Sequence, residues 1–216
     1  MDALAVLTAY LLGAVPFTQI VSRRLTGIDL RTVGTGTVSG TGLYNVAGLW
    51  PLVLGGGLDV AKGAGAALLA GDSDRARVLV GAAVVTGHCW SVFLGGAGGR
   101  GLSPSLGVLA VFAWPGALLL LAALAVGKLV DEAGLAAFIA DLLLVVALAV
   151  ARGWRGAALA LALVLPMVLK RLMGNAAPEP GGGLRTYGAR LLYDADQHGA
   201  PAAHTQPPGG LRSGPN

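Results

Sequence analysis

The chain is poor in charge, in aromatic residues and in cysteine. Of its 216 residues only 12% are charged and 6% aromatic, whereas 55% are hydrophobic, and the mean hydropathy is +0.71. An ordinary soluble domain carries about 25% charged residues, so this class is excluded. The single cysteine, Cys89, excludes an internal disulfide, and together with the adjacent His88 it is too small a ligand set for a zinc site. The composition is that of a polytopic membrane protein.

The excess of positive charge does not indicate a nucleic-acid binder. Fifteen Lys and Arg against eleven Asp and Glu give a formal net charge of +4. Most of these cations flank apolar runs, which is the distribution of residues at the ends of membrane spans. Membrane lipids are therefore expected as partners, and nucleic acid is not.

Six apolar runs approach or reach the length of about 20 residues that crosses a bilayer. They predict an all-α fold, a polytopic transmembrane helical bundle of six to seven helices. A seventh crossing is expected only if 48–70 is split at its glycine triplet, and Pro115 is available to kink the fourth run. The runs are 3–21, 44–70, 78–94, 106–126, 135–150 and 157–169.

Positive charge at the ends of the runs predicts the orientation in the membrane. Asp2 stands where a signal peptide would carry basic residues, so the first run is expected to be retained as a helix. Arg23 and Arg24 place the following loop in the cytoplasm and the N-terminus outside. Lys170 and Arg171, after the sixth run, favour a cytoplasmic end there, which requires an odd number of crossings.

Two regions are expected along the chain. The integral membrane domain occupies residues 1–174. From 175 to 216 the composition changes to Pro, Gly and Ala with isolated charges, which predicts a disordered tail with a short helix around 187–193.

The first glycine loop, residues 34–42, reads Gly-Thr-Gly-Thr-Val-Ser-Gly-Thr-Gly and follows Arg31 closely. Backbone N–H groups, hydroxyls and a nearby arginine are the donors that a phosphoryl group needs, and a helix starting near Thr41 would add its positive end. Small residues also let helices pack closely in lipid, and the loop matches neither common nucleotide-binding fingerprint. Phosphate binding and helix packing both remain open on this loop alone.

The second glycine loop, residues 95–101, carries Arg100 and follows His88 in the third run. Two further crossings return the chain to the side of the first loop, so the two loops can converge. A lone histidine at membrane depth is more often a packing residue than a catalyst. Asp59 and Lys62 lie three residues apart on one helix face, where they either serve a site or only neutralise each other.

Four elements occur in order between about residues 10 and 107. They are Tyr10-Leu11-Leu12-Gly13-Ala14-Val15-Pro16-Phe17, Asp29-Leu30-Arg31 before Gly34-Thr35-Gly36, Asp59-x-x-Lys62-Gly63, and Gly87-His88 leading into Gly98-Gly99-Arg100-Gly101. Together they resemble the membrane-integral, acyl-phosphate-dependent glycerol-3-phosphate acyltransferases of bacterial type. The chain is similar to a divergent member of that family.

The resemblance implies an activity and a location. Family members transfer an acyl group from acyl phosphate to the 1-hydroxyl of glycerol 3-phosphate, which gives lysophosphatidate for phospholipid biosynthesis, without a cofactor or metal. The partners implied are acyl phosphate, glycerol 3-phosphate and membrane lipids. The implied location is the cell inner (plasma) membrane, with a multi-pass chain and a site that faces the cytoplasm.

By matched position, the resemblance also assigns residue roles. Two residues are expected to be catalytic: His88 as the candidate base and Thr35 as a hydroxyl contact. The residues expected to bind phosphate or substrate are Arg31, Gly34, Gly36, Lys62, Gly98, Gly99 and Arg100.

The chain departs from the family at several polar positions. Thr35 replaces a serine, Asn45 stands where the family has an arginine implicated in phosphate binding, and Arg100 replaces a lysine. The last change exchanges a point charge for a planar fork. The family's third motif survives only as residues 170–174, Lys-Arg-Leu-Met-Gly, without its His, its Asn and its acidic residue.

These departures leave two alternatives. One is a homologue that binds a phosphorylated lipid without catalysis or acts on another substrate. The other, less favoured, is a small transporter with charged residues along its path, although no repeat symmetry supports it. Those residues would be Asp59, Lys62, His88 and Asp141.

Overall fold

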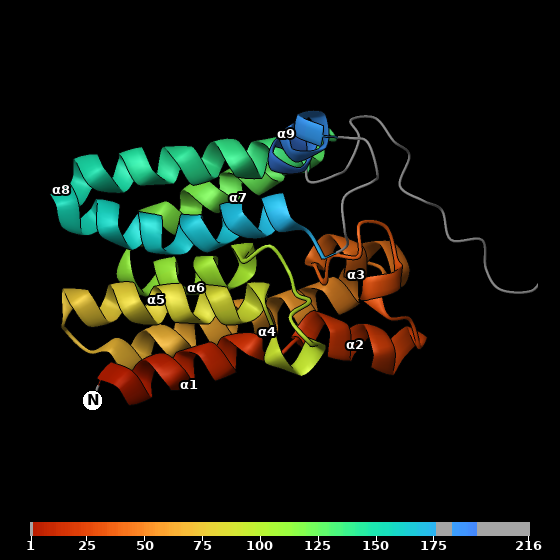
Figure 1. The fold of residues 1–216 in the computed structure, drawn as a ribbon, viewed down its shortest axis with the longest axis horizontal. Helices are drawn as coiled ribbons and strands as arrows, with labels where there is room; N and C mark the ends of the chain where they lie inside the picture. Colours follow the sequence, from red (N-terminus) through yellow and green to blue (C-terminus); the bar gives the residue numbers. More distant parts are fainter. Residues whose placement is uncertain (1, 176–182, 194–216) are drawn as a thin grey trace, which may run out of the picture.

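Helices make up every regular element in the residues that the computed structural model describes, 2–175 and 183–193 (Figure 1). The prediction of an all-α transmembrane bundle is confirmed. The helices are α1 (Asp2–Ala14), α2 (Phe17–Thr26), η1 (Leu30–Thr32), α3 (Gly40–Ala47), α4 (Leu49–Ala67), η2 (Leu68–Ala70), α5 (Asp74–Cys89), η3 (Val92–Leu94), α6 (Leu102–Phe112), α7 (Trp114–Leu129), α8 (Ala133–Met173) and α9 (Gly183–Tyr193).

Four stretches are long and apolar enough to cross a membrane, and α6 and α7 are shorter apolar helices. The exposed tryptophans lie where membrane interfaces are expected. Trp50 is in the first turn of α4, whereas Trp114 and Trp154 lie at the turns of the opposite end of the bundle, and each is at least 64% exposed. Aromatic side chains at both ends of an apolar bundle are typical of the two headgroup layers. The four stretches are Ala3–Thr26, Leu49–Ala70, Asp74–Leu94 and Ala133–Met173.

The fourth apolar run, expected as one helix over 106–126, is two helices that run in opposite directions. α6 begins next to Arg100, which donates to the Lys170 carbonyl at the end of α8, and it finishes at Phe112 at the opposite end of the bundle. The chain reverses at Ala113, which has φ −156° and ψ 63°. α7 then returns with Pro115 in its first turn, where proline costs no helical hydrogen bond.

α8 is a hairpin of two antiparallel arms, as Figure 1 shows. The reversal occurs at Gly153, whose φ of 62° and ψ of −149° are accessible essentially only to glycine. In consequence Arg171, near the end of α8, donates to the carbonyl of Gly134 near its start at 3.0 Å. The two arms correspond to the predicted runs 135–150 and 157–169.

The seventh crossing therefore comes from the division of the fourth apolar run into α6 and α7, and not from a break in α4. A split of 48–70 at residues 55–57, the condition named for a seventh crossing, does not occur, because α4 runs through the glycine triplet without interruption. Within the described residues, the α1 and α2 pair, α4, α5, α6, α7 and the two arms of α8 form seven legs. The end of α8 and the first glycine loop consequently lie at the same end of the bundle. The side of the membrane that this end faces stays a prediction.

Glycines allow α1, α4, α5 and α6 to pack with their backbones in close contact. A Cβ atom on Gly13 would collide with the backbone of Val84, and one on Gly87 with the backbone of Tyr10, where α1 crosses α5. Gly63 makes the same kind of contact with α6. Backbone contact of this kind is how helices pack tightly in lipid. It fixes the positions of α4 and α5, which carry Lys62 and His88.

α9 lies across the open end of the α8 hairpin (Figure 1). Arg171 donates to the Leu191 carbonyl of α9 at 3.3 Å, and Arg190 of α9 donates to the Met173 carbonyl of α8 at 3.0 Å. The region expected as a disordered tail thus contains a docked helix, longer than the short one expected at 187–193. The rest of that region, 176–182 and 194–216, lies outside the described residues.

Candidate functional site

The two glycine loops meet at one end of the bundle. The Val38 N–H donates to the Gly98 carbonyl at 3.1 Å, and the Gly99 N–H donates to the His88 carbonyl at 3.1 Å. A Cβ atom on Gly99 would collide with the His88 ring and with the Val38 carbonyl. The absence of a side chain at this position is what lets the loops and the histidine touch.

The first loop reaches this position by a tight turn. Gly34 and Gly36 have φ values of 55° and 68°, in the left-handed region that favours glycine. Ser39 then caps α3 by accepting a hydrogen bond from the Gly42 N–H at 3.1 Å. Thr35 lies on the exposed part of the turn, with its hydroxyl 2.9 Å from that of Thr37.

A narrow crevice lies beneath the meeting point of the loops. Four of the residues predicted for the site line it together: Lys62, His88, Gly98 and Gly99. The other lining residues are Gly13, Ala14, Pro16, Thr18, Val38, Ser91 and Leu94.

Lys62 is held from two sides in this crevice. Its Nζ atom lies 2.7 Å from Asp59 Oδ1 and donates to the Val15 carbonyl, also at 2.7 Å. His88 Nδ1 is 3.9 Å from the same carboxylate oxygen, and its Nε2 faces Gly99. Asp59 and Lys62 do neutralise each other, as one interpretation of the sequence expected, but the pair also lies in contact with the crevice.

Arg31 lies outside the crevice, at a separate cavity of about 310 Å³. The cavity opens between the two loops and the end of α8. Its donors include a guanidinium, a hydroxyl and an amide. The residues that line it are Asp29, Arg31, Thr32, Gly36, Ala97 and Asn175.

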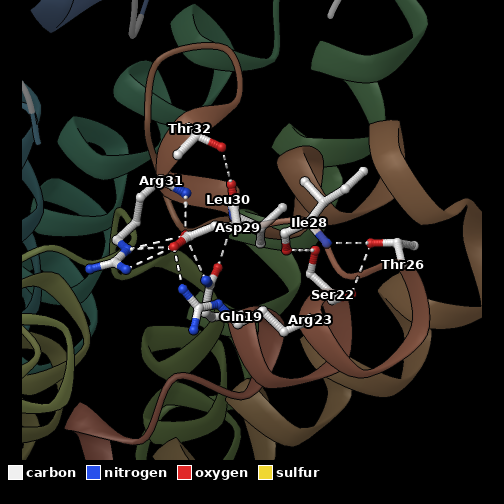
Figure 2. Close-up of polar contacts among 9 residues, drawn as sticks. All are labelled: Gln19, Ser22, Arg23, Thr26, Ile28, Asp29, Leu30, Arg31 and Thr32. Atoms are coloured by element: carbon white, nitrogen blue, oxygen red, sulfur yellow. Dashed lines mark hydrogen bonds and ion pairs between the residues drawn. The ribbon is translucent and has the colours of Figure 1, made fainter. Parts of the chain in front are cut away.

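Asp29 holds Arg31 in place (Figure 2). Its carboxylate accepts from the Arg31 N–H at 3.0 Å, from Nε at 3.1 Å and from Nη2 at 2.7 Å, and it also accepts from Gln19 and Arg23. Gln19 in turn accepts from the Leu30 N–H at 3.0 Å. The hydrogen bonds from Arg31 hold the pKa of Asp29 well below its usual range, and Asp29 raises the pKa of Arg31.

Arg100 extends towards α8. Its Nη1 donates to the Lys170 carbonyl at 2.6 Å. Lys170, only 1% exposed, donates from Nζ to the Gly96 carbonyl at 3.2 Å and lies over the Trp90 ring. Both cations therefore tie the second loop to the end of α8. Lys170 belongs to the remnant of the third motif, but no role in the site was predicted for it from the sequence.

Asn175 is a site residue that the sequence interpretation missed, because it assigned this position to the tail. Its Nδ2 donates to the carbonyls of Gly36 at 2.9 Å and Gly98 at 2.8 Å, and its Oδ1 accepts from the Gly98 N–H at 3.2 Å. One side chain thus joins the two glycine loops. Its place directly after the third-motif remnant was the only signal available in the sequence.

The predicted site residues fall into four groups. Lys62, His88, Gly98 and Gly99 are in the crevice, and Arg31 and Gly36 are at the cavity beside it. Gly34 and Thr35 are exposed on the first loop, and Arg100 contacts the end of α8. Their functional roles remain predictions.

The geometry does not favour a path for transport through the bundle. Asp59, Lys62 and His88 lie together beneath the glycine loops at one end. Asp141 is fully buried on the first arm of α8, and no hydrogen bond or ion pair joins it to that group in the part of the chain that the structure describes.

The fold and site define a polytopic helical membrane protein with a polar site at one end of the bundle, beneath two joined glycine loops. A family model described as glycerol-3-phosphate acyltransferase matches residues 3–176. The chain belongs to this family, and the resemblance noted from the four sequence elements is confirmed.

Curated relatives carry the same description. The glycerol-3-phosphate acyltransferase of Myxococcus xanthus (strain DK1622) is 39% identical over 147 residues, which are 63% of this chain and 76% of the relative. That of Shouchella clausii (strain KSM-K16) is 40% identical over 110 residues, 49% of this chain and 54% of the relative. That of Jannaschia sp. (strain CCS1) is 44% identical over 115 residues, 52% of this chain and 56% of the relative. For the last two, the chain spans little more than half the length of the relative.

Two solved structures have the same fold. Both are crystal structures of PlsY (YgiH), described as an integral membrane glycerol 3-phosphate acyltransferase. The glycerol 3-phosphate form has a TM-score of 0.71 and 30% identity, over 79% of this chain and 88% of that chain. The lysophosphatidic acid form has a TM-score of 0.68 and 26% identity, over 79% and 87%.

Proposed function

We propose that this protein transfers an acyl group from acyl phosphate to the 1-hydroxyl of glycerol 3-phosphate, forming lysophosphatidate in phospholipid biosynthesis. The observation that carries the proposal is the junction of the two glycine loops directly above Lys62 and His88. The forms in which the PlsY structures are described, with glycerol 3-phosphate and with lysophosphatidic acid, support the acceptor and the product. The acyl phosphate donor rests on the resemblance of the sequence motifs.

The reaction requires little from the protein beyond positioning. The acceptor hydroxyl attacks the acyl carbonyl carbon, the bond between that carbon and the phosphate oxygen breaks, and phosphate departs with the electron pair. Because phosphate is already a good leaving group, the main contributions are to hold two phosphorylated substrates together and to stabilise charge. The acyl tail would lie in an apolar groove between helices.

The residues then take the following roles. His88 receives the proton of the attacking hydroxyl at Nε2, the nitrogen that faces Gly99, while Asp59 lies on the Nδ1 side. Lys62 supplies positive charge in the crevice, and Arg31 supplies it in the neighbouring cavity. Arg100 donates to the Lys170 carbonyl and adds a positive charge to the second glycine loop, which attracts a phosphate group.

Thr35 offers a hydroxyl from the first loop, and the glycines of both loops offer backbone N–H groups at close range. The glycines with this role are Gly34, Gly36, Gly98 and Gly99. We place this end of the bundle at the cytoplasmic face of the cell inner (plasma) membrane, with the N-terminus outside. The cations after the first and sixth runs support that orientation.

An assay with purified protein in liposomes tests the proposal. Acyl phosphate and glycerol 3-phosphate are supplied together, and phosphate release and lysophosphatidate are measured in parallel. We expect equal amounts of both products. Arg100→Ala should abolish the reaction, while Arg24→Ala, which removes an exposed arginine at the end of α2, should leave it intact.

One outcome would overturn the proposal. A folded wild-type protein that releases no phosphate with glycerol 3-phosphate is not this enzyme. Binding of lysophosphatidate without turnover would then identify a non-catalytic homologue, and release with another phosphorylated acceptor would identify a changed substrate.

A further inference from the structure

Asn175 contacts both glycine loops through one side-chain amide. Its NH₂ group donates to two backbone carbonyls, one in each loop, at Gly36 and Gly98. Its oxygen accepts from the Gly98 N–H, so the amide makes two complementary bonds to the second loop. The direct backbone bond between the loops, from Val38 to Gly98, lies beside it.

Only a primary amide can make this set of contacts. The two carbonyls need a donor and the N–H needs an acceptor, and a carboxylate offers acceptors alone. An aspartate at this position would fit by size but would direct an oxygen at the carbonyls of Gly36 and Gly98. The contact therefore depends on the chemistry of the side chain and not only on its volume.

The end of α8 is held firmly enough to act as an anchor for this amide. Lys170, five residues earlier, donates to Gly96, and Arg100 donates back to the Lys170 carbonyl. On the other side, Arg190 of α9 donates to the carbonyl of Met173. Asn175 thus extends from a helix end that is itself attached to the second loop and to α9.

We propose that Asn175 is a positioning residue that holds the two glycine loops at the separation needed by the phosphorylated substrates. It also lines the cavity that contains Arg31, so a change in the loops would alter that cavity directly. The inference rests on the proposed function, because it gives the loops their substrates. Asn175 acts through the loops and takes no part in the bond that forms.

Kinetics with matched variants provide the first test. Asn175→Ala removes all three bonds. Asn175→Asp keeps the size of the side chain but replaces the donating NH₂ group with an oxygen that can only accept. Both should raise KM for acyl phosphate and for glycerol 3-phosphate by about tenfold, with a smaller change in kcat, because the loops hold the phosphates less well. Arg24→Ala, which removes an exposed side chain at the end of α2, should leave both constants unchanged.

Cross-linking measures the separation of the loops without any substrate. Thr32, at the end of η1 just before the first loop, and Ala97 of the second loop line the cavity from opposite sides, and the native Cys89 is buried. With cysteines at both positions, a short thiol cross-linker should join the loops more slowly in the Asn175→Ala and Asn175→Asp backgrounds than in the wild-type background. The Arg24→Ala background should match the wild type.

The outcomes separate this inference from the proposed function. Wild-type cross-linking rates and wild-type KM values in both Asn175 variants would overturn the positioning role. An unchanged Asn175→Asp protein beside an impaired Asn175→Ala protein would also overturn it, because packing alone would then suffice. If wild-type protein is inactive while cross-linking still depends on Asn175, the contact between the loops stands and the proposed activity fails.

Discussion

Lys62 Nζ lies 2.7 Å from Asp59 Oδ1, less than one turn away on α4, and both side chains are only 1% exposed. Asp59→Asn would leave the ammonium group buried without its counter-ion. We expect a loss of about 3 to 5 kcal/mol in the free energy of unfolding, or failure to accumulate in the membrane. Thermal unfolding in detergent measures the change.

The double variant Asp59→Asn with Lys62→Met separates stability from function. It removes both charges, so we expect it to recover most of the stability lost in the single variant. It should remain inactive, because the cation in the crevice is absent. A double variant as unstable as Asp59→Asn would contradict the view that an unpaired charge is the cause.

Asp29 should give stability that depends on pH in a defined direction. Its pKa is lowered in the folded protein by the hydrogen bonds from Arg31, so its contribution is complete above its unfolded pKa of about 3.9. As the pH falls below that value towards the lower folded pKa, the contribution is lost. We expect the Tm difference between wild type and Asp29→Asn to be constant from about pH 5 to 8 and to shrink below about pH 4.

The same variant should affect binding of phosphate-bearing substrates. Without Asp29, the Arg31 guanidinium loses the partner that fixes its direction, so KM should rise more than kcat falls. Asp72→Asn serves as the control, since Asp72 is a fully exposed carboxylate beside Arg77 at the other end of the bundle. Asp72→Asn should leave KM unchanged, and an equal rise of KM in both variants would contradict the role of Asp29. Asp72→Asn is also the control for the pH dependence of stability, where an equal dependence in both variants would refute a special contribution from Asp29.

Local composition predicted the helices better than it predicted their reversals. The reversal between the arms of α8 was visible, because Gly153 and its charged neighbours interrupt the apolar run. The reversal between α6 and α7 at Ala113 was not visible in the sequence. An alanine in an apolar stretch carries no turn signal, and Pro115 is as compatible with a kink in one long helix as with the start of a second helix. The backbone breaks there because α6 and α7 pack on different neighbours, and that depends on the whole bundle.

The site shows the same limit. Lys62 and His88 were recognised from their motifs, and the glycines around residue 98 predicted a close approach. Asn175 was missed because its three bonds join residues up to 139 positions apart in the chain. No periodicity or spacing marks a contact of that kind, which exists only when α8 brings its end back to the loops.

Gly153 offers a test of the α8 hairpin. Gly153→Ala puts a side chain on a backbone with φ 62° and ψ −149°, and no atom lies near enough to the new Cβ to clash. The cost is therefore one of conformation, about 1 to 3 kcal/mol. Gly57→Ala, which also adds a methyl group to open space but inside α4, should stabilise the protein by about 0.5 to 1 kcal/mol. Chemical denaturation of both variants should give opposite signs, and equal signs would exclude the backbone as the cause.

Gly99 links the second glycine loop to the proposed base. A methyl group there would collide with His88 Nε2 and with the Val38 carbonyl, so Gly99→Ala must either displace the imidazole or separate the loops. We expect kcat to fall at least about a hundredfold, because both changes move the base away from the reacting hydroxyl. Gly56→Ala makes only an ordinary contact within α4 and should keep wild-type activity. Full activity in Gly99→Ala would mean that His88 does not act from the position it has beneath this loop, and the role of general base would then have to be withdrawn.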